Sequence, residues 1–134
     1  MGSPHLTHVA RPDGVAPGTG YTQVVTGRGR LVVVSGQLAL DAEGALVGGD
    51  DPEAQARQVF ANLRRGLAAA GATLGDVVKL TCFVLDIAHL PAIRRARDEV
   101  VDTDAPPAST AVAVVALALP GALLEIEAWA LAAD

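Results

Sequence analysis

Apolar residues recur along this chain with two different periods, one typical of strands and one typical of an amphipathic helix. Spacings of four and three residues between apolar positions predict a long helix over residues 52–70. Asp51 is suited to cap its first turn, Pro52 to occupy its first position and Gly71 to end it. Runs of β-prone residues predict strands at 21–27, 31–40, 77–87, 110–119 and 123–131, and a shorter helix is expected at 89–101.

The predicted element order β-β-α-β-α-β-β indicates an α+β sandwich, in which two helices cover one face of a mixed sheet. The other face then has no covering layer. Residues 31–34 and 111–117 are apolar on both sides of their strands. Because large exposed apolar patches are rare on monomers, we expect copies of the chain to associate through the sheet.

Composition limits the class of protein. The chain has 134 residues, enough for one domain, which we place at residues 21–134 after a flexible leader at residues 1–20 that is rich in glycine and proline. The formal net charge of −5 argues against nucleic-acid and anionic-membrane partners. Cys82 is the single cysteine, and neither a signal peptide nor an apolar stretch of bilayer length is recognisable, so a cytoplasmic location is expected. Cys82 lies on a predicted strand in which apolar residues alternate, which indicates an unreactive thiol in the core.

Short motifs in a fixed order run from about Tyr21 to Leu131, and together they resemble the RidA (YjgF) family. The matching pieces are Val34-Ser35-Gly36-Gln37, Gln55-Ala56-Arg57-Gln58, Asn62-Leu63, Ala70-Gly71-Ala72, Gly75-Asp76-Val77-Val78-Lys79, Pro107-Ala108 and Glu125-Ile126-Glu127-Ala128. The resemblance implies a chorismate-mutase-like α+β sandwich that forms a homotrimer, with a small-molecule cleft at each subunit interface. It also implies hydrolysis of reactive enamines or imines, such as 2-aminoacrylate, without a metal or an organic cofactor.

The resemblance assigns roles to two positions of this chain. In the family, the first glutamate of the Glu-x-Glu strand orients a water molecule, and Glu125 matches it. An arginine after the Pro-Ala pair anchors the substrate carboxylate, but Ser109 stands there in this chain. Either Arg94 or Arg97 replaces the missing charge from the shorter helix, or the natural ligand has no carboxylate at that end. A trimer that binds a metabolite or a partner without catalysis is the alternative function.

The remaining candidates are expected to line the cleft. Tyr21 aligns with a cleft tyrosine of the family, and the interruption of the second strand by Ser35, Gly36 and Gln37 is typical either of a cleft wall or of a plain bulge. Asp98 lies four residues after Arg94, a spacing that would allow an ion pair on the helix surface. We find no clustered metal ligands and no phosphate-binding loop in the sequence, so neither a metal nor a nucleotide cofactor is expected.

Overall fold

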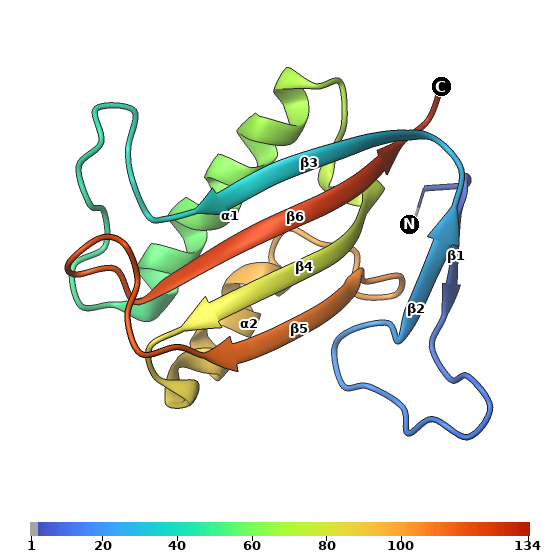
Figure 1. Cartoon of the computed structure of the whole chain (residues 1–134), viewed down its shortest axis with the longest axis horizontal. Helices are drawn as coiled ribbons and strands as arrows, with labels where there is room; N and C mark the ends of the chain where they lie inside the picture. Colours follow the sequence, from blue (N-terminus) through green and yellow to red (C-terminus); the bar gives the residue numbers. More distant parts are fainter. Residues whose placement is uncertain (1–2) are drawn as a thin grey trace.

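The computed structural model describes residues 3–134, whose strands and helices are shown in Figure 1. The strands are β1 (Leu6–Val9), β2 (Val24–Gly27), β3 (Arg30–Gln37), β4 (Val77–Val84), β5 (Ala108–Ala113) and β6 (Leu124–Ala132). The helices are α1 (Pro52–Ala69) and α2 (Leu90–Asp98), each preceded or followed by a short 3-10 turn. No helix within residues 3–134 is long and apolar enough to cross a bilayer.

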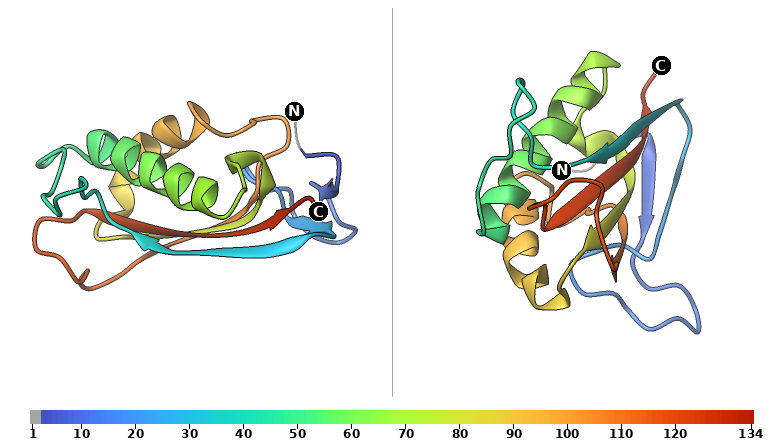
Figure 2. Two further views of the ribbon diagram at one scale, coloured as in Figure 1. Left: turned by 90° about the horizontal axis from the view of Figure 1, so that it is seen from above. Right: turned by 60° about the vertical axis from the view of Figure 1, so that its left-hand side comes forward.

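The main sheet is mixed, and both helices lie on one of its faces (Figure 2). Its strand order is β3-β6-β4-β5; β4 and β5 are parallel, whereas β6 is antiparallel to both of its neighbours. The chain passes from β4 through α2 to reach the parallel strand β5, as such a connection requires. The predicted α+β architecture with two helices on one face is confirmed.

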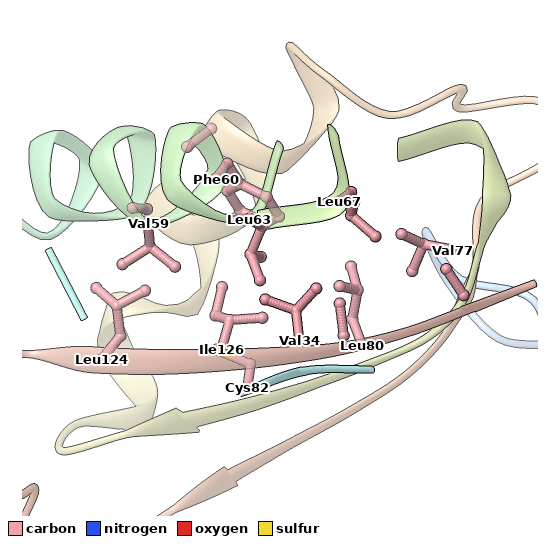
Figure 3. Close-up of a cluster of buried hydrophobic side chains, with 14 of the residues drawn as sticks. Val34, Val59, Phe60, Leu63, Leu67, Val77, Leu80, Cys82, Leu124 and Ile126 are labelled. Atoms are coloured by element: carbon pink, nitrogen blue, oxygen red, sulfur yellow. The ribbon is translucent and has the colours of Figure 1, made fainter. Parts of the chain in front are cut away.

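The core lies between α1 and the sheet, and its side chains point toward one another from the two layers (Figure 3). Helix α1 begins where Asp51 accepts hydrogen bonds from the backbone N–H groups of Glu53 and Ala54. Leu63 and Leu67 are fully buried against the sheet, at the spacing that the apolar stripe predicts. Apolar periodicity alone therefore locates this helix and its buried side.

Residues of β6 alternate between the two faces of the sheet. Leu124, Ile126 and Ala128 are buried beneath the helices, whereas Glu125, Glu127 and Trp129 lie on the face without helices, which we call the open face. Apolar side chains are exposed on this open face: Leu31 (57%), Val33 (53%), Trp129 (44%) and Val112 (41%). The uncovered apolar face that the sequence predicts is thus present in the single chain.

Several predicted boundaries are wrong. We assigned no strand to residues 1–20, yet β1 pairs antiparallel with β2, and Leu6 is buried. The strand expected over residues 110–119 is β5, which ends at Ala113, because its only neighbour β4 ends at Val84. Beyond that point the apolar residues of the chain have no strand with which to pair. A local sequence pattern cannot report the length of a partner strand.

Candidate functional site

A cavity of about 380 Å³ lies between α2 and the start of β5. Its floor is apolar and its polar groups come from three separate segments of the chain. The lining residues are Tyr21, Phe60, Leu80, Cys82, Leu90, Ile93, Arg94, Arg97, Ser109, Thr110, Ala111 and Ile126. A concave apolar site with a few convergent polar groups is typical of a small-molecule binding site.

Tyr21 is held at this cavity because the next residue, Thr22, is anchored to the segment just before β5. Thr22 donates from its hydroxyl to the Pro106 carbonyl (2.6 Å) and from its backbone N–H to the Pro107 carbonyl (3.2 Å). A Cβ at Gly18 would lie 2.6 Å from the Tyr21 ring, so a glycine is needed for the ring to pack there. Tyr21, the first residue of the predicted domain, therefore forms a wall of the cavity, and Gly18 of the predicted leader packs against its ring.

The two arginines of α2 differ in their surroundings. Arg94 is exposed at the cavity, whereas the Arg97 residue is only 9% exposed. The Arg97 Nε donates to the Asp98 carboxylate at 2.9 Å, so the predicted pairing of Asp98 with Arg94 is wrong. An ideal Cβ at Gly20, whose φ is +77°, would lie 2.8 Å from the Arg97 Nη2. The turn around Gly20 thus packs against the Arg97 guanidinium and contributes to its burial.

Ser109 and Cys82 complete the side of the cavity formed by the sheet. Ser109 pairs with Leu80 across β5 and β4, and both line the cavity. Cys82 is buried, as the sequence predicts, and burial raises the pKa of its thiol to about 12. The charges of Arg94 and Arg97 act in the opposite direction on that pKa. Both guanidinium groups therefore lie within electrostatic reach of the cavity floor.

Glu125 lies on the open face of the sheet, away from this cavity. Its carboxylate lies over Gly36, where an ideal Cβ would be 1.9 Å from the Glu125 Oε2. The β3–β6 register shifts between Val34 and Gln37, which confirms the bulge that the Ser35-Gly36-Gln37 interruption allows. Among residues 3–134, no group forms a hydrogen bond or ion pair with the Glu125 carboxylate.

The structure therefore divides the predicted site residues into two groups within one chain. Tyr21, Arg94 and Ser109 line the cavity between α2 and β5. Glu125 and Gly36 meet on the open face, where Ser35 is exposed, while the Gln37 side-chain amide donates to the Ser35 carbonyl. Gly36 and Gln37 also border a second hollow beside α1.

Sequence reasoning missed the apolar part of the cavity, to which Leu90, Ile93 and Thr110 contribute. It also missed the burial of Arg97. A faint signal was present in the two glycines that flank Thr19 just before Tyr21, because paired glycines often permit a close approach of backbone to another group. Residues 3–134 contain no cluster of three or more metal-ligating side chains.

Both the sequence and the fold of this chain are similar to those of known proteins of one family. The family model described as Endoribonuclease L-PSP matches residues 12–132. A Rid-family protein of unknown function, YyfB from Yersinia pestis, is similar over 96% of this chain and 99% of its own, with 38% identity and a TM-score of 0.82. RidA from an Antarctic Psychrobacter shares 33% identity over 97% of this chain and 100% of its own, with a TM-score of 0.71.

A third similar structure, from Mycobacterium tuberculosis, is described as a member of the YjgF/YER057c/UK114 family. It shares 33% identity over 95% of this chain and 99% of its own, with a TM-score of 0.66. The chain belongs to this Endoribonuclease L-PSP family, which includes the RidA and YjgF proteins.

Proposed function

We propose that this protein hydrolyses a small reactive imine or enamine to a carbonyl compound and ammonia, at clefts between the subunits of a homotrimer. The observation that supports this most directly is the Glu125 carboxylate, which the bulge at Gly36 accommodates and which no group of residues 3–134 engages. A carboxylate held in place without a structural partner is available to orient a water molecule.

A second copy of the chain is needed to complete this site. Glu125 lies on the open face, whereas Ser109, Tyr21 and the two arginines line the cavity on the helix-covered side. Packing the apolar open faces together would bury Leu31, Val33 and Trp129. In the trimer that we propose, the open face of one subunit also meets the β5 edge of the next, so that Glu125 of the first lies near the cavity mouth at Ser109 of the second.

Glu125 would act on water and on the substrate nitrogen in turn. As water attacks the carbon of the protonated imine, Glu125 accepts one proton of the water and the C=N electron pair moves to nitrogen, which gives a neutral carbinolamine. Glu125 then donates that proton to the nitrogen. As the C–N bond breaks, the carboxylate takes the proton of the carbinolamine hydroxyl, so that the carbonyl forms and ammonia leaves. Positioning of water and general acid-base catalysis are the contributions that this geometry can make.

Ammonia release from imines that an amino-acid oxidase generates in situ tests this proposal. Glu125→Gln is expected to lower turnover by at least about 100-fold, because the amide cannot accept the proton. Glu127→Gln is the matched control, since Glu127 lies two residues further along the same face of β6 and is expected to leave turnover unchanged. Equal rates for Glu125→Gln and the unmodified protein would refute the catalytic role.

Ser109 favours one alternative, a trimer that binds a small metabolite without turning it over, because a serine cannot neutralise a carboxylate as the family's arginine does. Silence of the unmodified protein on every imine, with ligand binding retained, would favour that alternative. The family description names an endoribonuclease, but the net charge of −5 opposes the approach of a polyanionic RNA, so we propose a small-molecule substrate. The single cysteine supports a reducing compartment such as the cytoplasm.

A further inference from the structure

Four charged side chains link the start of α1 to α2 and to the residue that follows α2. Arg95 of α2 donates from its Nε to the Glu53 Oε1 at 2.7 Å. The Arg57 Nη2 donates to the Glu53 Oε2 at 2.7 Å. The Arg57 Nε and Nη2 also donate to the two carboxylate oxygens of Glu99, at 3.1 and 2.9 Å. Because Glu53 and Arg57 each bond to two partners, the four side chains form one continuous network.

Helix α2 has little apolar contact to hold it in place. It packs on α1, beside which it lies in Figure 2. Its buried apolar residues are Ala92, Ile93 and Ala96, and the two alanines remove little apolar surface from water. The side chain of its N-cap residue, His89, forms no capping hydrogen bond. Since a helix of nine residues is only marginally stable by itself, its contacts with α1 decide whether it stays in position.

The other side of α2 borders the cavity. Ile93, Arg94 and Arg97 line it from α2, and Cys82 lines it from β4. The Cys82 residue is only 7% exposed while α2 is in this position. A movement of α2 away from α1 would therefore change the shape of the cavity and uncover the Cys82 thiol.

We propose that the network of Glu53, Arg57, Arg95 and Glu99 is a latch that holds α2 against α1, and that ionic strength controls it. Single ion pairs at a surface contribute little, but these pairs share side chains, and Arg57 binds Glu99 through two parallel hydrogen bonds. The side chains of Arg57, Arg95 and Glu99 are exposed to solvent, so salt screens their attraction. The latch acts on the cavity whatever ligand occupies it, so its tests need no turnover.

Amide hydrogen exchange tests the latch on the purified full-length protein, with mass spectrometry of peptides as the readout. Raising the NaCl concentration from about 0.05 M to about 1 M is expected to speed exchange in α2 by about tenfold, because the exchange rate reports how often the helix opens. Residues 60–69, in the second half of α1 and outside the network, are the internal reference and should change by less than about twofold. An equal change in both segments, or no change in α2, would overturn the inference.

Variants of α1 identify the responsible group. At low salt, Arg57→Gln is expected to speed exchange in α2 by about tenfold and to reduce its response to added salt. Arg57→Lys should have a smaller effect, since the ammonium keeps the charge but not the two parallel hydrogen bonds. Arg64→Gln is the matched control, because Arg64 is exposed two helical turns further along α1 and forms no ion pair within residues 3–134. Exchange in α2 at the wild-type rate in Arg57→Gln would refute the latch.

Cys82 gives a second readout, because it is the single cysteine and lines the cavity beside α2. Arg57→Gln should speed its alkylation by iodoacetamide by a factor similar to that seen in exchange, while the amides of β4 and β6 stay as protected as in the wild-type protein. Faster exchange throughout β4 and β6 would mean that Arg57 stabilises the whole fold rather than the position of α2, and would refute the latch. If Arg57→Gln does not fold, as judged by circular dichroism, the salt comparison on the wild-type protein decides the question.

Discussion

Gly36 provides a sharp test of the position of the Glu125 carboxylate. An alanine Cβ there would lie 1.9 Å from the Glu125 Oε2, whereas ordinary contacts begin at 3.4 Å. The carboxylate of a Gly36→Ala protein must therefore move by about 1.5 Å, the difference between those two distances. The backbone itself is not strained, because Gly36 is not among the residues with positive φ.

The size of the effect follows from that displacement. A misplacement of about 1 Å in a catalytic group can lower a rate by about 100-fold. We expect kcat for imine hydrolysis to fall by about this factor in Gly36→Ala. We also expect KM to change little, because the proposed role of Glu125 is to act on the water and not to hold the substrate. The free energy of unfolding should change by less than about 1 kcal/mol, since a flexible side chain can move aside.

The assay is ammonia release under saturating substrate, with thermal unfolding measured in parallel. Gly75→Ala is the matched control, because an added Cβ there would meet the Ser3 and Thr73 hydroxyl oxygens at 3.4 and 3.5 Å, which is ordinary contact. A Gly36→Ala protein with a kcat within about threefold of wild type would refute the requirement for this carboxylate position.

Three further predictions concern assembly, stability and reactivity. Trimers assembled from equal amounts of Glu125→Gln and Arg97→Gln subunits should recover about a quarter of wild-type ammonia release. About that share of the interfaces would join an intact Glu125 of one subunit to an intact Arg97 of the next. No recovery would mean that Glu125 and Arg97 act within one chain. Gln55→Leu should lower the free energy of unfolding in urea by about 3 kcal/mol or more, because Gln55 is fully buried and satisfies three backbone groups near residues 49 and 121–123. The half-buried Gln23→Leu loses a single hydrogen bond, to the Ala16 carbonyl, and should change it by less than about 1 kcal/mol. Alkylation of Cys82 by iodoacetamide at pH 8 should be about a thousandfold slower in the native protein than in guanidinium chloride. Burial raises the pKa of the thiol from 9.0 to about 12, so little of the reactive thiolate is present in the native protein. An alkylation rate in the native protein near that of the denatured protein would contradict this.

Local patterns in the sequence were sufficient for much of the fold. The apolar stripe and the Asp51 cap located α1 to within a residue, and alternation along β6 separated Glu125 and Glu127 from the buried side. Each of these features depends on residues close in sequence, so their period and chemistry can be read directly. The ordered motifs likewise sufficed to indicate the family.

Long-range features were beyond the reach of the sequence. The burial of Arg97 depends on the turn at Gly20, which lies 77 positions away in the chain and packs on α2 only after folding. The early end of β5 depends on where β4 stops. No local period encodes either relation.

The amino-acid sequence was enough to indicate the family, the order of the elements from β2 onward and the outward direction of Glu125, because these follow from residue type and short-range spacing. Tyr21, Arg97 and Ser109 share one cavity, and Glu125 occupies the opposite face of the sheet, only because of how the folded chain packs. The reason is physical: contacts between distant segments, and the burial that they produce, arise from packing rather than from any local pattern.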